Sequence, residues 1–330
     1  MRKGATTLGC ILFSCVLLAN ADVKSMEGKA ECVMEATTRR ILYESNGDMR
    51  LPMASTTKIV TAMTVLSLCE NVKAEVTIPA QAEGIEGSSV YLKQGEKYTV
   101  EELLFGLMLR SGNDCATALA LYSAGDIAAF TAKMNETAQA AGALHTNFQN
   151  PHGLPAQGHY TTARDLTAIS CSAMQDTTFR QIVSTKYYEP RHWQNKNKML
   201  FNYEGGIGIK TGYTKEAGRC LVSAAERGGM TLVCTLLNCP TTYERTHALF
   251  DDAFSSYRMV NVLSKGREFT LGNKCGITRE EFSYPLLEGE EKAIEYLVTP
   301  LKSDIDEEII GHLKITLAKR LLFSTNLYKL

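Results

Sequence analysis

The feature that most constrains the fold is a predicted helix over residues 58–68 that is apolar on nearly every face. Its apolar side chains are Ile59, Val60, Ala62, Met63, Val65, Leu66 and Leu68. A surface helix would carry a polar face, so we expect this helix to lie at the centre of a domain. Ser55 stands at its start, where a serine can cap free N–H groups, and Lys58 follows one turn later. Capping does not account for the lysine, which must lie at the rim of the core or serve a function.

The elements that would surround this helix are predicted from caps and periodicity. Helices are expected over residues 100–110, 114–123, 126–141 and 162–174. Two strands are expected within residues 30–45, and strand-like runs fill residues 205–237, with a tight hairpin at Arg227-Gly228-Gly229. A closing helix is expected over 241–257. The predicted fold class is therefore α+β, with a helical block inserted between an N-terminal hairpin and C-terminal antiparallel strands.

The two ends of the chain predict further organisation. Arg2 and Lys3 precede an apolar run, and Ala19-Asn20-Ala21 has the form of a cleavage site, so residues 1–21 are expected to be a secretory signal peptide. The protein is therefore expected outside the cytoplasm. Short β-like runs after residue 259 predict a small, mostly β domain over 260–330, which leaves 22–259 as the main domain.

Charge and cysteine content narrow the classes of partner. The net charge of −1 gives no indication of a nucleic-acid partner. Export would permit disulfides among the eight cysteines that follow residue 21, but they form no C-x-x-C or metal-ligand spacing, and their pairing is left open. No H-E-x-x-H motif is present, so no metal and no cofactor are implied.

Three short motifs carry candidate chemistry. In S-x-x-K, Lys58 on the same helical face as Ser55 could deprotonate the serine if burial or a second cation lowers the pKa of the lysine. In S-G-N, Ser111 could relay a proton and Asn113 could bind a carbonyl. In K-T-G, Lys210 could attract an anion, while Gly212 lets another backbone approach. Each motif also has a plain structural interpretation: a capped helix with a rim lysine, a turn between helices, and an edge strand blunted by lysine.

The three motifs together are more specific than each alone. In this order they are typical of penicillin-binding proteins and class A β-lactamases. With Gly112 in the middle motif, the chain resembles the serine-type D-alanyl-D-alanine carboxypeptidases, which are low-molecular-mass penicillin-binding proteins. The resemblance covers roughly residues 28–258 and extends to N-P-H-G-L at 150–154 and to the text around K-T-G at 208–222. It implies a β-lactamase/DD-peptidase-like transpeptidase fold.

The resemblance also implies catalytic roles. Ser55 would attack the peptide bond between the last two D-alanines, and Lys58 would take its proton. Ser111 would pass a proton to the leaving D-alanine, while Asn113 would hold the amide of the penultimate residue. Water would then hydrolyse the acyl-enzyme on Ser55.

Substrate-binding roles follow from the same resemblance. Lys210 would keep Lys58 neutral and draw in the C-terminal carboxylate, which Thr211 would contact. Gly212 would belong to the substrate-binding strand, and the backbone N–H groups of Ser55 and Tyr213 would form the oxyanion hole. The partners implied are peptidoglycan stem peptides ending in D-Ala-D-Ala and β-lactams. Membrane association has little support, because residues 317–330 read as closing strands.

The sequence disfavours two other kinds of serine enzyme. A class A β-lactamase would need a glutamate four residues before an asparagine, and Glu136, Glu189 and Glu204 do not fit. A Ser-His-Asp hydrolase built on His152 or His159 is disfavoured, because G-x-S-x-G is absent and Lys58 already supplies a base. An endopeptidase acting on cross-links and a non-catalytic peptidoglycan-binding protein stay open as alternatives.

Overall fold

The computed structural model describes residues 27–272, 274–301 and 308–330, which fold as two compact units. Of the described residues, the larger unit comprises 27–226 and 231–251, and the smaller comprises 227–230 and those from 252 onward. The domain boundary predicted at 259/260 lies further along the chain than this division, inside strand β10 (Tyr257–Leu263). The predicted signal peptide lies outside the described residues.

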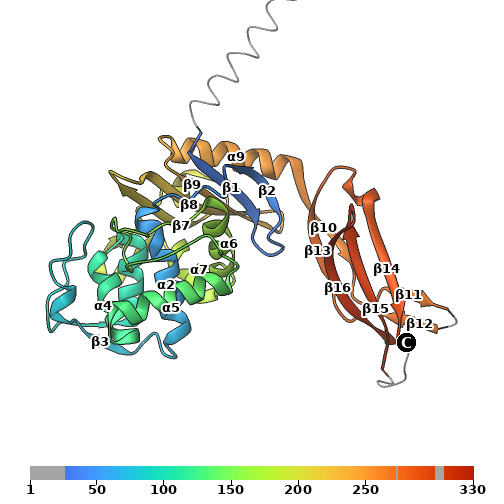
Figure 1. Cartoon of the computed structure of the whole chain (residues 1–330), viewed down its shortest axis with the longest axis horizontal. Coiled ribbons are helices and arrows are strands. Elements are labelled where there is room, and N and C mark those ends of the chain that lie inside the picture. Colours follow the sequence, from blue (N-terminus) through green and yellow to red (C-terminus); the bar gives the residue numbers. More distant parts are fainter. Residues whose placement is uncertain (1–26, 273, 302–307) are drawn as a thin grey trace, which may run out of the picture. The chain divides into compact units, whose positions relative to one another are not determined.

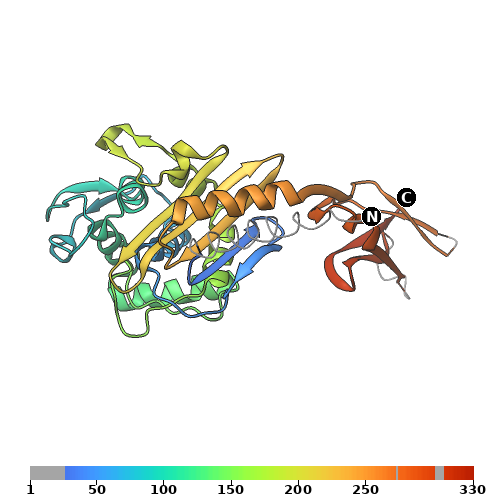
Figure 2. The same cartoon turned by 90° about the horizontal axis from the view of Figure 1, so that it is seen from above.

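The larger unit is built on a five-stranded sheet with the order β2-β1-β9-β8-β7. Its strands are β1 (Ala30–Glu35), β2 (Ile41–Ser45), β7 (Gly206–Thr214), β8 (Gly218–Arg227) and β9 (Met230–Leu237). The pairs β1–β2, β1–β9 and β7–β8 are antiparallel. Helix α9 (Thr242–Ser256) runs along one face of this sheet, and the helical block covers the other (Figures 1 and 2). The N-terminal and C-terminal strands of the unit thus share one sheet, as predicted.

Helix α2 (Lys58–Leu68) forms the centre of the helical block. It packs against α4 (Asn113–Ala124), α5 (Ile127–Ala140) and α6 (Ala163–Ala173), and most of its side chains are buried. The prediction of a central helix is confirmed, because an all-round apolar segment is stable only where every face meets another element. The other helices of the unit are α3 (Val100–Phe105), α7 (Thr177–Ser184) and the short α8 (Met199–Asn202).

Helix ends follow the predicted caps closely. Thr99 caps α3 in a reciprocal capping box with Glu102, and the side chains of Asp126 and Thr162 cap α5 and α6. The predicted helix to residue 110 is continuous, but from Gly106 to Arg110 it is a π-helical turn, η3. Ser55 is not a cap, since it lies in a 3₁₀ turn, η1 (Ala54–Thr57), and α2 begins only at Lys58. The capping role considered for this serine is therefore wrong.

Short elements line the edges of the larger unit. They comprise the hairpin β3 (Glu75–Thr77) and β4 (Lys97–Thr99), the hairpin β5 (Tyr187–Tyr188) and β6 (Trp193–Gln194), and the 3₁₀ turns η2 (Ala80–Ala82) and η4 (Glu189–Arg191). These pairs are two or three residues long. Segments of that length carry too little alternation to be recognised in sequence.

The smaller unit is almost entirely β. One hairpin pairs β10 with β13 (Phe282–Leu287), and a second sheet has the order β11-β12-β16-β15-β14. Its strands are β11 (Glu268–Leu271), β12 (Lys274–Ile277), β14 (Ile294–Pro300), β15 (Ile309–Leu317) and β16 (Arg320–Lys329), with the 3₁₀ turn η5 (Glu290–Ala293) before β14. The prediction that residues 317–330 form strands is confirmed, since they contain the end of β15 and all of β16.

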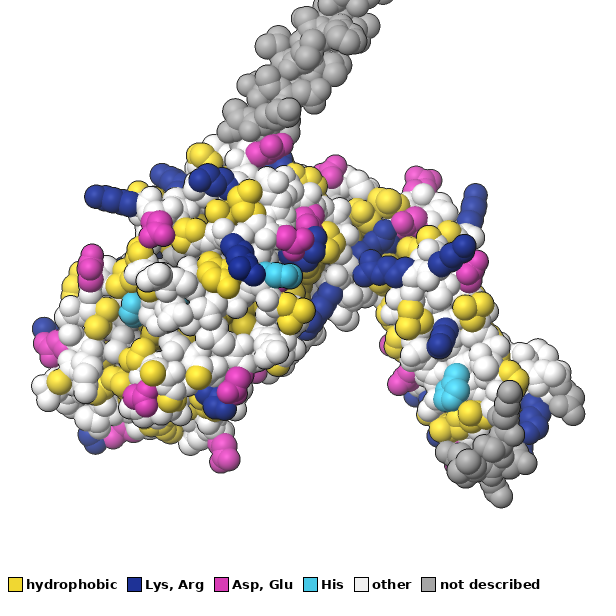
Figure 3. Space-filling model, viewed as in Figure 1, with side chains coloured by type: hydrophobic (Ala, Val, Ile, Leu, Met, Phe, Trp, Pro, Cys, Tyr) yellow, Lys and Arg dark blue, Asp and Glu magenta, His cyan; other side chains and the backbone are white. Residues whose placement is uncertain are grey.

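On the face shown in Figure 3, charges of both signs are intermixed. Within the described residues, no single helix is long and apolar enough to span a membrane, while the bent pair α4–α5 passes that test by length and composition alone. The same residues contain no group of three His, Cys, Asp or Glu side chains placed to hold a metal ion.

Candidate active site

The candidate nucleophile lies in a turn held from two sides. Ala54, just before Ser55, has a left-handed φ of 50°, a conformation that costs free energy for a residue with a side chain. Gly153 packs directly on this turn, since a β-carbon added to it would lie 2.0 Å from the Ala54 carbonyl oxygen. His159 Nε2 lies 2.9 Å from Thr57 Oγ1. The surrounding loop therefore fixes the backbone that presents Ser55.

Lys58 is fully buried and its amine has three close neighbours. Its Nζ lies 2.6 Å from Asn113 Oδ1, 2.6 Å from the His152 carbonyl oxygen and 3.1 Å from Ser55 Oγ. Burial, and after it the positive charge of Lys210, lowers the pKa of Lys58 well below its ordinary value. The contact between Ser55 and Lys58 that the i, i+3 spacing predicts is present.

This arrangement directs a lone pair at Ser55. A neutral lysine amine has two N–H groups and one lone pair. The carbonyl oxygens of Asn113 and His152 can only accept, so they take the two N–H groups. The lone pair is then left for the third neighbour, and the Ser55 hydroxyl can donate to it. In its neutral form Lys58 is therefore oriented as a base for Ser55.

The S-G-N motif connects η3 to α4 beside Lys58. Ser111 is buried and has a φ of 67°, so it ends η3 in the left-handed conformation and turns the chain into α4. The Asn113 amide bridges two parts of the site, since Oδ1 accepts from Lys58 and Nδ2 donates to the Glu86 carbonyl oxygen at 2.5 Å. Its orientation is thereby fixed by partners on both sides.

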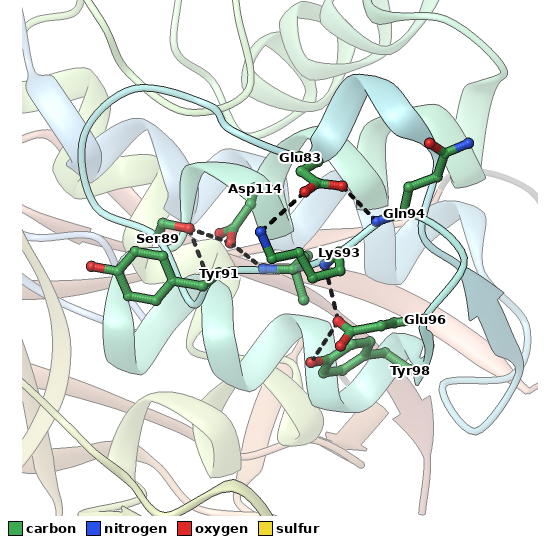
Figure 4. A network of polar contacts seen from close by, with 9 residues as sticks. Glu83, Ser89, Tyr91, Lys93, Gln94, Glu96, Tyr98 and Asp114 are labelled. Atoms are coloured by element: carbon green, nitrogen blue, oxygen red, sulfur yellow. Dashed lines mark hydrogen bonds and ion pairs between the residues drawn. The ribbon is translucent and has the colours of Figure 1, made fainter.

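Asp114 anchors the loop that carries Glu86. Its carboxylate accepts from Ser89 Oγ and from the backbone N–H groups of Val90 and Leu92. Figure 4 shows Asp114 facing this loop, with a second set of contacts from Glu83 to Lys93 and Gln94 further along it. Since the loop supplies the acceptor for Asn113 Nδ2, Asp114 positions the amide indirectly.

The K-T-G strand brings a second buried lysine to the site. Lys210, on β7, is 1% exposed. Burial, followed by the positive charge of Lys196, lowers the pKa of Lys210 to about 7. Arg110 in turn contributes to a lowered pKa of Lys196, after burial. The site thus contains a series of mutually repelling cations, and this repulsion favours neutral Lys58.

Gly212 allows β7 to lie against the nucleophile turn. A β-carbon added there would lie 3.0 Å from the Met53 carbonyl oxygen and 3.2 Å from the Ser55 backbone nitrogen. Thr211 is half-buried and Tyr213 is 65% exposed. The strand therefore presents one wall of an open cleft next to Ser55. All eight residues predicted for the site lie on three neighbouring segments, η1–α2, η3–α4 and β7.

His152 and His159 form hydrogen bonds within the loops around the site. Burial lowers the pKa of His159 to about 4, so its ring is neutral near pH 7. Its Nδ1 accepts from the Gln149 backbone N–H, which leaves Nε2–H to donate to Thr57. Burial, followed by the charge of Lys58, also lowers the pKa of His152 to about 4. His152 contributes its carbonyl oxygen, not its ring, to Lys58.

Four contributors were not singled out by sequence reasoning: the His152 carbonyl, Gly153, Asp114 and Lys196. Three of them stand in or beside segments already noted, because His152 and Gly153 lie within N-P-H-G-L and Asp114 follows S-G-N. The only signal was therefore proximity to a motif. A backbone carbonyl and a rim lysine carry no signal of their own.

The chain is similar in sequence and in structure to known proteins. A family model described as D-alanyl-D-alanine carboxypeptidase matches residues 18–241. Carboxypeptidase DacF of Bacillus subtilis is 32% identical over 70% of this chain and 63% of its own length, so the chain spans less than two thirds of that relative. DacA of Escherichia coli is 31% identical over 81% of this chain and 73% of its own. Penicillin binding protein 5 from Haemophilus influenzae superposes with a TM-score of 0.79 at 25% identity, covering 92% of this chain and 97% of that one.

Proposed function

Since the chain belongs to the D-alanyl-D-alanine carboxypeptidase family, we propose that it is a serine D,D-carboxypeptidase that removes the terminal D-alanine from peptidoglycan stem pentapeptides. The observation that carries this proposal is the hydrogen bonding of Lys58, which leaves its lone pair for the Ser55 hydroxyl. A merely structural lysine would be exposed or paired with a carboxylate. This one is fully buried near a second cation, Lys210, and both conditions favour the neutral amine.

Acylation begins with proton transfer from Ser55 to Lys58. The Ser55 oxygen attacks the carbonyl carbon of the penultimate D-alanine, and the charge that develops on the carbonyl oxygen meets the backbone N–H groups of Ser55 and Tyr213. The close approach of Gly212 to the Ser55 nitrogen supports this pairing of strand and turn. The proton then passes to the leaving amine, with Ser111 as the relay, and D-alanine departs.

Deacylation uses the same groups in reverse. Water attacks the ester on Ser55, and Lys58 accepts the proton from the water. Asn113 holds the backbone amide of the acyl group, for which its two fixed hydrogen bonds pre-orient it. A β-lactam would acylate Ser55 in the same way and inhibit the enzyme, because it resembles the D-Ala-D-Ala end.

The cellular setting belongs to the same proposal. A substrate in the cell wall requires a protein on the outer side of the membrane, and the N-terminal sequence has the form of a signal peptide. The protein would then take part in peptidoglycan biosynthesis and, through it, in cell-wall biogenesis and cell shape. No cofactor is required for any step, since serine, lysine and water supply the chemistry.

The test is D-alanine release from an N-acetylated L-Lys-D-Ala-D-Ala peptide by residues 22–330. We expect release by the native protein and none above background by Ser55→Ala. Ser67→Ala, at an exposed position near the end of α2, is the matched control and should retain the native rate. Intact-protein mass spectrometry after penicillin treatment should show one adduct, absent from Ser55→Ala. A well-folded native protein that releases no D-alanine would contradict the proposal and favour the endopeptidase or the non-catalytic binder.

A further inference from the structure

The segment over residues 150–154 lies directly against the start of α2. The Pro151 carbonyl oxygen accepts from Thr61 Oγ1 at 2.6 Å, and the His152 carbonyl oxygen accepts from Lys58 Nζ at 2.6 Å. The first contact fixes the segment on the helix, and the second gives the candidate base one of its two carbonyl acceptors. The orientation of a single backbone carbonyl, that of His152, therefore bears directly on how the Lys58 amine points.

One side chain ties this segment together. Asn150 Oδ1 accepts from the backbone N–H of Gly153 at 2.7 Å and from that of His152 at 3.3 Å. The Nδ2 group of the same amide donates to the Leu154 carbonyl oxygen at 2.9 Å. Three bonds from one short side chain to residues that follow it form a local turn of the kind to which asparagine is suited. The bond to Gly153 is the shortest of the three.

The bond to Gly153 controls the His152 carbonyl through the peptide plane. The Gly153 N–H and the His152 carbonyl belong to one peptide unit, which is planar and trans, so the two groups point in opposite directions. With the N–H held by Asn150 Oδ1, the carbonyl oxygen on the far side is directed at Lys58 Nζ. Asn150 thus acts on the lysine across a single rigid unit.

The glycine makes this control necessary. A β-carbon at Gly153 would lie 2.0 Å from the Ala54 carbonyl oxygen, so only glycine fits there, and its φ is 89°. Glycine takes either sign of φ at similar cost. The peptide unit before it can therefore turn over with little backbone penalty, which would point the His152 carbonyl away from Lys58. A hydrogen bond from outside the backbone is needed to select one orientation, and Asn150 provides it.

We infer that Asn150 is a positioning residue for the base: it holds the His152 carbonyl toward Lys58 and so aims the lone pair of Lys58 at Ser55. The inference deepens the proposed function and rests on it for the assignment of Lys58 as the base. Without the Asn150 amide, one N–H of neutral Lys58 loses its fixed acceptor. The amine can then rotate, and its lone pair is no longer reserved for the Ser55 hydroxyl.

The test replaces the Asn150 side chain in graded steps. Asn150→Ala removes all three bonds, whereas Asn150→Asp keeps the acceptor for the Gly153 N–H and adds a negative charge. Asn135→Ala is the matched control, because Asn135 holds Phe148 by the same kind of bonds, at 2.8 Å from the Phe148 N–H and 3.1 Å to its carbonyl oxygen. Two rates are measured from pH 5 to 10: D-alanine release, and acylation of Ser55 by a penicillin followed by intact-protein mass spectrometry.

We expect Asn150→Ala to lower kcat and the acylation rate roughly 10- to 100-fold with KM within about threefold, because the base is misdirected while the substrate still binds. Loss of an acceptor also disfavours the ammonium form, so the pKa of Lys58 falls and the acidic limb of the profile moves to lower pH. Asn150→Asp should recover most of the rate at its own optimum. Its charge favours the ammonium form, so its acidic limb should move to higher pH.

The control and the contrary outcome are equally definite. Asn135→Ala should stay within about twofold of the native rates, with an unmoved limb. A loss in Asn150→Ala that Asn150→Asp does not relieve, or that leaves the limb unmoved, would overturn the inference and assign Asn150 a structural role. Where Asn150→Ala does not fold, Asn150→Ser takes its place, because its shorter side chain reaches the Gly153 N–H less well, and the same criteria apply. Unfolding followed by the fluorescence of Trp193, the single tryptophan, checks that each variant is folded.

A direct titration of Lys58 separates this inference from the proposed function. The amine is followed by carbon-13 NMR of protein labelled at the lysine Cε atoms, and Lys58→Met assigns its signal. The groups that face Lys58 are the same in every Asn150 variant: Lys210 on β7, Lys196 before α8, Asp114 and Cys115 on α4, and the His152 ring.

The outcomes of this titration do not depend on turnover. If the native protein releases no D-alanine, the proposed function fails, yet a Lys58 titration that moves to lower pH in Asn150→Ala, and not in Asn135→Ala, would still support the positioning role. A Lys58 titration that is the same in the native protein and in Asn150→Ala would overturn the inference even in an active enzyme.

Discussion

At the scale of single residues, the site depends on a lysine that must lose its proton near neutral pH. Lys58 is buried among acceptors from Asn113 and His152, which also suit an ammonium group, so hydrogen bonding alone does not make it neutral. Burial and the charge of Lys210 shift the balance. The charge of the neighbour and the basicity of Lys58 are therefore linked.

This link predicts the effect of replacing Lys210. A positive neighbour disfavours protonation, so removing it in Lys210→Gln should raise the pKa of Lys58. The acidic limb of the pH profile of kcat/KM should then move to higher pH by about one unit or more, in addition to any loss of rate. Lys210→Arg keeps the charge and should keep the limb within about half a unit of the native position. The measurement is D-alanine release from pH 5 to 10, and an unmoved limb in Lys210→Gln would show that burial alone tunes Lys58.

Residue spacing alone predicts only the local part of this arrangement. The i, i+3 spacing predicts that Ser55 and Lys58 meet, and they do. The acceptors on Asn113 and His152 lie far away in the sequence, and the second of them is a backbone carbonyl. No side-chain pattern could indicate it, because any residue type at position 152 presents the same group.

At the scale of elements, caps and periodicity predict the helices, whereas tertiary contacts decide the details. The caps at Thr99, Asp126 and Thr162 are readable because a side chain of the right type precedes an apolar run. The π-helical turn over residues 106–110 cannot be predicted from the sequence pattern. There Gly106 packs against Cys115 and Trp193, so the turn reflects packing with distant segments.

A buried ion pair joins α9 to the sheet and predicts a large effect on stability. Arg245 on α9 donates to Glu31 on β1 through Nε and Nη2, at 3.0 and 2.6 Å, and both side chains are almost fully buried. Arg245→Met should lower the free energy of unfolding by about 3–5 kcal/mol, because it leaves the Glu31 carboxylate buried without its cation. Denaturant unfolding followed by Trp193 fluorescence measures this change.

The double variant Glu31→Leu/Arg245→Met is the control for this ion pair. It removes both charges, and we expect it to be more stable than Arg245→Met alone. If the double variant were less stable than the single one, the cost would come from lost packing and not from an unpaired carboxylate.

Because Asp114 anchors the loop, we expect its replacement to affect substrate binding more than the chemical step. Asp114→Ala removes the acceptor of Ser89, Val90 and Leu92, which frees the segment that holds Asn113 Nδ2. We expect KM to rise several-fold with a smaller change in kcat, since Lys58 and Ser55 keep their contact. Asp114→Asn, which keeps one acceptor oxygen, should lie between the two. A fall in kcat at unchanged KM would instead place the effect on the reacting groups.

At the scale of the whole molecule, the sequence predicts two units and their classes, and the reason is compositional. The helical block flanked by strands differs from the tail of short β-like runs in the periodicity of its apolar residues. This difference can be read from a single sequence. Where the first unit ends is harder to predict, because α9 runs across the division between residues 251 and 252 without a change of pattern. Element type is a local property, but a domain boundary depends on which contacts the element makes.

The neutral, buried histidines give the larger unit an acid sensitivity of its own. Burial lowers the pKa of His159 to about 4, whereas an exposed imidazole titrates near 6.5. Between these two values the unfolded chain binds a proton that the folded protein does not, so the free energy of unfolding falls as the pH drops from about 6.5 to about 4. His159 accounts for roughly 3 kcal/mol of that fall at most, and the change is complete below pH 4.

His159→Gln tests this dependence. The variant should be less stable than the native protein at pH 7, because glutamine does not reproduce both hydrogen bonds to Thr57 and Gln149. It should nevertheless lose less stability between pH 6.5 and 4, so the two curves should converge at low pH. His192→Gln, at an exposed position, is the matched control and should run parallel to the native curve. Stability is measured by urea unfolding at half-unit pH steps, followed by Trp193 fluorescence. If His159→Gln ran parallel to the native protein, the acid sensitivity would lie in other groups, because only a difference in proton binding between the folded and unfolded states changes the slope.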